Sequence, residues 1–278
     1  MNMKTIYKCF PRGKFKVLTM SYDDGREPDK RLISLFNDHG IKGSFHLNSG
    51  LLKDAPKAPN DIYGLRIPKE EIKDIFEGHE VSCHTATHPT IERSPVGQVV
   101  KEIIDDREEL EEIVGYTVRG LSYPNGSYSD EIKAILPSVG IEYARVVEIC
   151  ENFNIPRDFL EWKATCRHSD PNLLKYADDF LELSKKQYLY MFYVWGHSYE
   201  FPRDNNWEVI EEFCEKLGNK DDIWYATNIE IVDYLKVCDN LKFSMNGDFV
   251  YNPSFQSVWL SVDGVIYEIP GGKQIYFK

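Results

Sequence analysis

The chain has 278 residues, of which 42% are hydrophobic and 13% aromatic, so it is long enough to bury a sizeable core. Its 33 lysines and arginines against 45 aspartates and glutamates give a net charge of −12, which argues against nucleic acid and anionic membranes as partners. No secretory signal and no 18-residue apolar stretch are evident, and the six cysteines form no CxxC pair. We therefore expect a cytoplasmic globular protein with free thiols.

Short apolar stretches rich in β-branched and aromatic residues alternate along the chain with amphipathic stretches of helical period. The predicted strands cover 16–22, 42–48, 79–85, 119–124, 142–147, 160–166, 189–197 and 222–227. Helices are predicted between them, among others at 28–39, 68–77 and 96–114. The charged face of the last helix is interpreted as a solvated surface. This alternation predicts an α/β fold, a (β/α) barrel with its sites at the carboxyl ends of the strands.

The pattern changes near residue 240, where helical period is lost. Three β-hairpin turns are expected beyond this point, at Asn246-Gly247, Asp263-Gly264 and Gly271-Gly272. We therefore predict a barrel over 1–239 and a small β-hairpin appendage over 240–278. Because no Pro-rich or Ser-rich linker separates the two, the appendage is expected to pack on the barrel.

The strand at 16–22 ends in two adjacent carboxylates, Asp23 and Asp24, which Gly25 follows. An Asp-Asp-Gly sequence is also a common turn, so the pair has a purely structural alternative. The carboxyl ends of parallel strands meet at one end of a barrel. The two carboxylates are therefore expected to lie near the polar residues that follow other strands.

Two of those polar residues, His84 and His88, are four residues apart. On a helical turn this spacing places both imidazoles on one face, as two ligands of one ion require, although a hydrogen-bonded structural pair is the alternative. With Asp24 as a third ligand, coordination positions of the ion stay open for water and substrate, which is typical of a hydrolytic metal site. Asp23 would then take the proton of the metal-bound water as general base. The ligands suit Zn²⁺ best, while Co²⁺, Ni²⁺ or Mn²⁺ would also fit.

Four short motifs in this order resemble those of a known family. They are SYDDG at 21–25, HTATH at 84–88, LSYPNGSYS at 121–129 and YVWGH at 193–197. Over about residues 14 to 230 the chain is similar to the NodB-homology polysaccharide deacetylases of carbohydrate esterase family 4. The resemblance implies a distorted (β/α) barrel of seven or eight strands, to which the β appendage predicted above is added. It also implies metal-dependent removal of acetyl groups from an N- or O-acetylated carbohydrate.

The resemblance assigns roles to individual residues. It implies that Asp23 is the general base, that His197 is the acid protonating the leaving group, and that the metal ligands are Asp24, His84 and His88. It further implies that the backbone N–H of Asn125 stabilises the oxyanion together with the metal.

The chain differs from the family at one supporting position, because Ser122 stands where many members carry an arginine that restrains the base. Arg167 is our first candidate to supply that charge to Asp23, and Arg145 is the second. A surface or interstrand ion pair is the alternative for both arginines.

Several aromatic and polar residues lie close to the motifs. We predict that Tyr123 and Trp162 face the site and bind the sugar, whereas Trp195 belongs to the core. His46 and Asn48, near the end of the second strand, are candidates either to line the pocket or to cap a loop.

Two other functions stay open at this point. The chain is alternatively an amidohydrolase that acts on a small non-sugar amide, or a noncatalytic sugar-binding protein of the same fold. The expected partner is an acetylated oligosaccharide or polysaccharide. No oligomeric state is predicted.

Overall fold

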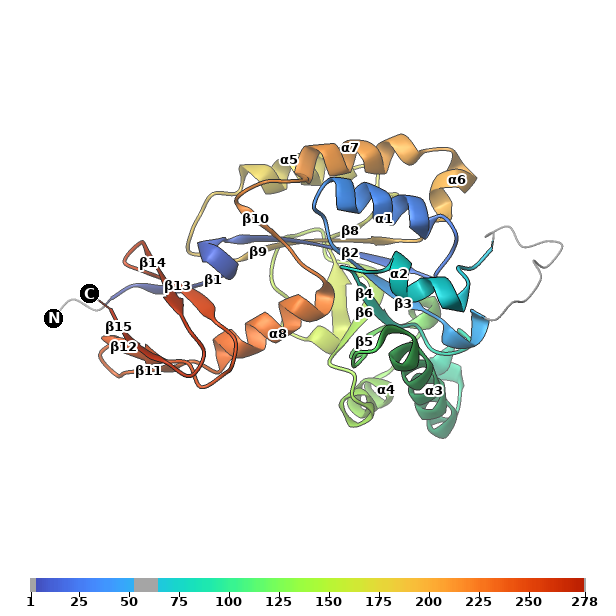
Figure 1. The fold of residues 1–278 in the computed structure, drawn as a ribbon, viewed down its shortest axis with the longest axis horizontal. Helices are drawn as coiled ribbons and strands as arrows, with labels where there is room; N and C mark the ends of the chain where they lie inside the picture. Colours follow the sequence, from blue (N-terminus) through green and yellow to red (C-terminus); the bar gives the residue numbers. More distant parts are fainter. Residues whose placement is uncertain (1–3, 53–64, 278) are drawn as a thin grey trace.

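The computed structural model describes residues 4–52 and 65–277. A large parallel sheet surrounded by helices forms the main body, and two small antiparallel sheets lie at one end of it (Figure 1). Among the described residues, no helix combines the length and the apolar character needed to cross a bilayer.

The parallel sheet has nine strands. They are β2 (Lys16–Asp23), β3 (Gly43–Leu47), β4 (Glu80–Cys83), β5 (Gly120–Ser122), β6 (Tyr143–Ile149), β7 (Trp162–Ala164), β8 (Cys166–Arg167), β9 (Tyr190–Gly196) and β10 (Ile223–Tyr225). Their order is β7-β6-β5-β4-β3-β2-β9-β8, and β10 pairs with the first half of β2. Every predicted strand is present, the one at 160–166 being divided into β7 and β8.

The two ends of this sheet come together because β7 and β8 are separated by a single residue, Thr165. β7 pairs with β6, and β8 pairs with β9. The N–H of Thr165 donates to Tyr193 O at 2.8 Å, while the N–H of Cys150 donates to Ala164 O at 2.8 Å. One stretch of chain, 162–167, therefore contacts both ends of the sheet and rolls it into a distorted barrel, as predicted.

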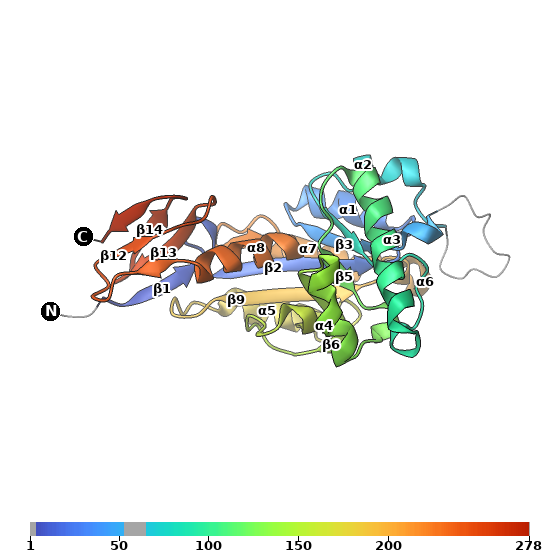
Figure 2. The same ribbon diagram turned by 90° about the horizontal axis from the view of Figure 1, so that it is seen from below.

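Helices cover the outside of the barrel. They are α1 (Asp29–Asp38), α2 (Ile72–Ile75), α3 (Val96–Val114), α4 (Asp130–Ile135), α5 (Leu173–Glu182), α6 (Glu200–Asp204), α7 (Trp207–Leu217) and α8 (Asn228–Asp239). In α1, Leu32, Ile33 and Phe36 are buried on one face, as the period predicts. All eight residues of β2 are buried, because helices pack on its outer face and the barrel interior covers the other. Figure 2 shows this layering from a second direction.

The barrel interior contains buried polar side chains where many barrels hold layers of branched aliphatic residues. These polar groups are contributed by alternate residues of neighbouring strands, namely Thr19, Ser21, Ser44, His46, Glu80, Ser82 and Tyr143. Parallel pairing in register, such as Asp23 opposite His46, places them in layers beneath the carboxyl ends of the strands. The site described below therefore lies on a polar interior.

The small sheets are built mainly from the end of the chain. One contains β1 (Ile6–Cys9), β13 (Val258–Val262) and β14 (Val265–Ile269), and the other contains β11 (Lys242–Phe243), β12 (Phe249–Tyr251) and β15 (Gln274–Tyr276). β1, which the sequence pattern did not predict, pairs with β13. The predicted domain division at residue 240 stays a prediction.

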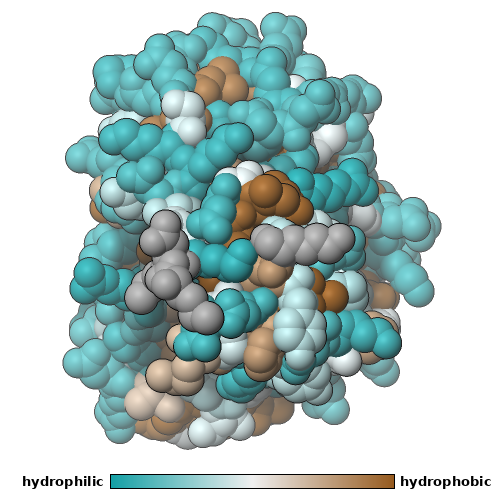
Figure 3. Space-filling view, turned by 90° about the vertical axis from the view of Figure 1, so that its left-hand side faces the viewer, coloured by the Kyte–Doolittle hydropathy of each residue, from teal (hydrophilic) through white to brown (hydrophobic). Residues whose placement is uncertain are grey.

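Hydrophobic contacts join the small sheets to the barrel through α8. Val250, Leu260 and Ile269 belong to the same buried cluster as Ile231 and Tyr234 of α8. The Tyr234 hydroxyl also donates to Cys9 O at 2.5 Å. Figure 3 looks onto this end of the molecule, where hydrophilic residues surround a smaller area of hydrophobic ones.

Candidate active site

A pocket of about 500 Å³ lies at the carboxyl ends of β2, β4 and β9. Its lining residues include Asp23, Asp24, Arg26, Leu51, Arg66, His84, His88, Tyr123, Asn125, Val147, Trp195, His197 and Tyr199. Three of them have left-handed backbone conformations that side-chain-bearing residues rarely adopt, with φ of 83° at Asp24, 58° at His88 and 56° at Asn125. Such backbone conformations are common at functional sites.

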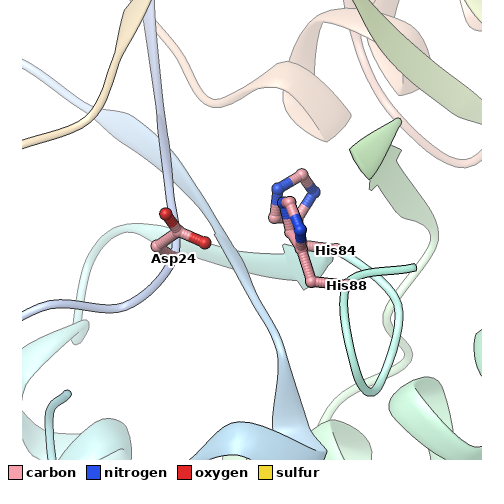
Figure 4. A group of neighbouring side chains, drawn as sticks. All are labelled: Asp24, His84 and His88. Carbon is pink, nitrogen blue, oxygen red and sulfur yellow. The ribbon is translucent and has the colours of Figure 1, made fainter. Parts of the chain in front are cut away.

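Asp24, His84 and His88 form a compact group (Figure 4). One ligand atom from each lies within 4.8 Å of the others. The ring centroids of the two histidines are 4.6 Å apart, and the Asp24 carboxylate lies opposite them. The three residues predicted as metal ligands are thus brought together.

The chemistry of these donors fits a divalent ion. His84 is buried, and its Nδ1 lies 2.7 Å from the carbonyl oxygen of Ser122, so Nδ1 carries the proton and the lone pair is on Nε2. Burial lowers the pKa of His84 to about 4, which keeps the imidazole neutral as a metal ligand must be. A hydrogen bond that fixes the second ring nitrogen in this way is usual for metal-binding histidines.

Two carboxylates of α3 hold the loop that carries the histidines. Asp106 is fully buried and accepts hydrogen bonds from the N–H groups of Ser49 at 2.7 Å and His84 at 3.0 Å. Glu102, one turn earlier, accepts from both the N–H and the hydroxyl of Thr87. The interpretation of the charged face of 96–114 as solvated surface is therefore wrong for Asp106, because the 84–88 loop covers it.

Asp23 is buried at the end of β2, and Arg145 of β6 is its charged partner. Arg145 Nη2 donates to Asp23 Oδ2 and also contacts Ser122 Oγ, which donates to the same oxygen at 3.1 Å. Burial raises the pKa of Asp23, but the charge of Arg145 and the nearby His84 outweigh it and hold the pKa well below its usual range. The carboxylate is therefore ionised at neutral pH.

The geometry does not place Arg167, our first candidate, against Asp23. Arg167 is the last residue of β8, on the other side of the pocket, where its Nη2 pairs with Glu200 Oε1 and lies 3.3 Å from His197 Nδ1. The second candidate, Arg145, occupies the position beside Asp23. The physical reason is the barrel register, since Arg145 lies directly opposite Ser122 on the neighbouring strand.

His197 lies at the end of β9 with 18% of its side chain exposed. In the neutral ring Nδ1 can accept from Arg167 Nη2, whereas in the imidazolium Nδ1–H can donate to Glu200. Glu200, at the start of α6, lies 3.5 Å from the same Nδ1 and 2.8 Å from His168 Nε2. Sequence reasoning missed Glu200, although its position three residues after His197 was a usable signal.

The aromatic predictions are partly reversed. Tyr123 lines the pocket, with its hydroxyl donating to Leu160 O at 2.8 Å. Trp162 is fully buried among Tyr143, Phe159 and Tyr193, so it belongs to the core and does not line the pocket. Trp195 belongs to the buried core cluster, as predicted, and also forms part of the pocket wall.

The remaining candidates differ in position. Asn125 lines the pocket, and its side chain donates to Thr90 Oγ1 at 3.2 Å. Asn48 donates to the carbonyl oxygens of His84 and Thr85, so it caps the histidine loop. His46 is fully buried beneath the pocket, in contact with Asp23 at 3.4 Å.

The barrel and this group of side chains define an α/β protein with a candidate hydrolytic centre at its strand ends. Residues 11–144 match the family described as polysaccharide deacetylase, and this region thus belongs to that family, with its NodB homology. The family resemblance stated from the sequence motifs is confirmed. The matched region ends just before Arg145, and His197 also lies beyond it.

A curated relative and two solved structures are similar to this chain. The chain is 27% identical over 128 residues to the peptidoglycan-N-acetylmuramic acid deacetylase PdaC of Bacillus subtilis, a match covering 44% of this chain and 27% of that protein. A putative polysaccharide deacetylase from Mycobacterium smegmatis aligns over 86% of this chain and 96% of its own, with 13% identity and a TM-score of 0.59.

The other structure is a family 4 carbohydrate esterase pseudoenzyme from Bacillus anthracis. It aligns over 82% of this chain and 68% of its own, with 16% identity and a TM-score of 0.50. At these identities the two structures establish the fold alone. The aligned region spans only about a quarter of the length of PdaC.

Proposed function

We propose that this chain is a metal-dependent hydrolase that removes acetyl groups from an N- or O-acetylated carbohydrate. The observation that carries the proposal is the presence, in one pocket, of Asp24, His84 and His88 together with Asp23 and His197. The family of residues 11–144 supports the substrate class. The metal-ligand, base and acid positions are all filled by suitable residues. This weighs against the noncatalytic alternative, because a sugar-binding protein has no need of these residues.

In this proposal Asp24, His84 and His88 hold the divalent ion, with Zn²⁺ the most suitable and Co²⁺, Ni²⁺ or Mn²⁺ as alternatives. When bound, such an ion supplies Lewis-acid polarisation of the acetyl carbonyl and eases the ionisation of water. The contacts of Asp106 and Ser122 keep His84 in place on the buried floor of the pocket.

Proton transfer falls to two other residues. Asp23, kept ionised by Arg145, accepts the proton of the attacking water at its carboxylate. His197 in its imidazolium form, with Nδ1–H facing Glu200, donates its Nε2 proton to the nitrogen or oxygen that leaves with the sugar. Arg167 and Glu200 orient the imidazole by contacting Nδ1. The backbone N–H of Asn125 is assigned to the developing oxyanion.

The pocket walls would bind and orient the acetylated sugar. Tyr123 and Trp195 provide aromatic surface, and Val147 provides an apolar rim that is 38% exposed. The partner of this site is then an acetylated oligosaccharide or polysaccharide. The cytoplasmic location expected from the sequence stays a prediction.

Acetate release from acetylated sugars, measured beside a panel of cyclic and linear amides, tests the proposal. We expect release from a sugar, a loss of at least roughly 100-fold after chelation, and recovery with Zn²⁺. His88→Ala should lose the metal and the activity, whereas His39→Gln, at a histidine outside the pocket, should keep both.

Two outcomes would contradict the proposal. Turnover of amides without acetate release from any sugar would favour the amidohydrolase. Tight binding of an acetylated sugar without turnover, in the Zn²⁺-loaded protein, would favour the noncatalytic sugar-binding protein.

A further inference from the structure

A chain of buried polar groups leads from Asp23 into the barrel. Asp23 Oδ1 lies 3.4 Å from His46 Nδ1, and His46 Nε2 lies 3.4 Å from the hydroxyl of Tyr143. That hydroxyl lies 2.8 Å from Glu80 Oε1. His46, Tyr143 and Glu80 are buried, and neither the pocket nor the proposed proton transfers use them.

The two carboxylate oxygens of Glu80 have different partners. Oε2 accepts from the N–H of Ile229 at 3.0 Å and from the hydroxyl of Ser44 at 2.7 Å. The hydroxyl oxygen of Ser44 itself accepts from the N–H of Asn228 at 2.8 Å, so its hydrogen is free to point at Glu80. Because Oε2 already receives two hydrogens, a proton taken up by Glu80 resides on Oε1, which faces Tyr143.

When Glu80 is ionised, Tyr143 donates its single hydrogen to Oε1. The Tyr143 oxygen also lies 3.1 Å from Ser82 Oγ, whose hydroxyl can donate to it. Towards His46 the Tyr143 oxygen can then only accept, so the ring proton is on Nε2. His46 Nδ1 carries a lone pair and accepts from Ser21 Oγ at 3.2 Å. Asp23 Oδ1, 3.4 Å from this nitrogen, receives no hydrogen from His46 in this state.

When Glu80 is neutral, every hydrogen in the chain reverses. Oε1–H donates to the Tyr143 oxygen, and Tyr143 donates to His46 Nε2. The ring proton of His46 is then on Nδ1, facing Asp23 Oδ1. A carboxylate that accepts one more hydrogen bond is a weaker base.

We propose that Glu80, Tyr143 and His46 are positioning residues that decide whether Asp23 receives a hydrogen bond from His46. The proposal rests on the function proposed above, because it acts on Asp23 as the base. The protonation state of Glu80 selects the tautomer of His46, and the tautomer sets the basicity of Asp23.

The surroundings of Glu80 allow both protonation states near neutrality. Burial raises the pKa of Glu80 to about 7, against the hydrogen bonds that it accepts. The titratable and charged groups that face it from the neighbouring elements are His46 of β3, Tyr143 of β6 and Glu230 of α8, the last paired with Lys42. Burial lowers the pKa of His46, so its ring stays neutral while Glu80 titrates.

Nitrogen-15 NMR of the full-length, Zn²⁺-loaded protein labelled at histidine reads the tautomer directly, with His46 assigned by the loss of its signals in His46→Gln. We expect the Nε2–H tautomer at pH 9 and a shift to Nδ1–H towards pH 6. In Glu80→Gln the amide oxygen must take the position of Oε2, because that position accepts from Ser44 and Ile229, so the amide N–H₂ faces Tyr143. We therefore expect the Nδ1–H tautomer of His46 at every pH in this variant. Glu112→Gln, at an exposed glutamate of α3, should titrate like the parent.

Tyr143→Phe provides a second test that does not depend on the stability of Glu80→Gln. Without the hydroxyl, the His46 tautomer should no longer follow pH. In turnover of an acetylated sugar at pH 8, Glu80→Gln should lower kcat roughly fivefold with KM unchanged, since one neutral hydrogen bond to the base is gained.

A His46 tautomer that is constant with pH in the parent and unchanged in Glu80→Gln would overturn the proposal, whatever the activity. A tautomer that responds as expected in a protein without deacetylase activity would support the hydrogen-bond chain and overturn the proposed function. The two proposals therefore fail by different measurements.

Discussion

On the base side of the pocket Asp23 is 2% exposed and paired with the buried Arg145, whereas on the acid side His197 keeps 18% of its side chain exposed. The acid side takes Arg167 from β8, which pairs with β9, whereas the base side takes Arg145 from β6, which does not pair with β2. Arg145 contacts the carboxylate itself, while Arg167 contacts Nδ1 of the imidazole and is paired with Glu200.

The difference shows that one residue type has two uses in the same pocket. Arg145 changes the charge state of its partner, because a full positive charge lies against a desolvated carboxylate. Arg167 is balanced by Glu200, so it mainly directs the hydrogen bonding of His197. The base side is thus predicted to act through charge, and the acid side through orientation.

The largest effect is expected at the base. Asp23→Asn should reduce deacetylation by roughly 1,000-fold or more, because the carboxylate that accepts the proton is gone. Metal content, measured by elemental analysis, should stay near that of the parent. Loss of metal along with activity would show that Asp23 is itself a ligand, and melting curves would control for the unpaired charge left on Arg145.

His197→Ala should have a smaller effect that depends on the substrate. We expect roughly a 100-fold loss with an N-acetyl substrate and much less with an activated ester, because an amine leaves poorly unless protonated. The measurement is the ratio of the two rates in the variant and the parent. Equal losses on both substrates would remove His197 from the role of acid.

Substitution of the two arginines is expected to have the smallest effect on the rate. It also compares the base side of the pocket with the acid side most directly. Without the charge of Arg145 the pKa of Asp23 rises, so in Arg145→Ala the acidic limb of the kcat/KM profile should move to higher pH, with roughly a tenfold loss near pH 6. Arg167→Ala should lower the rate without moving that limb. A shift of the limb in Arg167→Ala alone would reverse the assignment of the two arginines.

The sequence predicted the features that depend on local pattern. The strands followed from apolar stretches between turn residues, and Asp24, His84 and His88 followed from motif spacing and from the meeting of strand ends. These residues belong to loops directly after strands, so their convergence requires only that the strands be parallel.

The misplaced residues depend on the register between strands far apart in the chain. Arg145 reaches Asp23 because it lies opposite Ser122, and Trp162 does not line the pocket because it packs among Tyr143, Phe159 and Tyr193. An arginine inside the otherwise apolar stretch 143–147 was the available signal. β1 was missed because its partner strand lies about 250 residues away.

That long separation affects the order in which the chain can fold. In the described part of the chain β1 pairs with β13 alone, with Ile6 opposite Val262. During synthesis on the ribosome the hydrogen bonds of β1 therefore cannot form until nearly all of these 278 residues have been made. Every strand of the barrel is synthesised before β13 and can pair earlier. Because such non-local pairing carries a high loop-closure cost, attachment of β1 is expected to be the last and slowest step of folding. The completed pocket would then form at one end of the molecule while the other end is still unpaired.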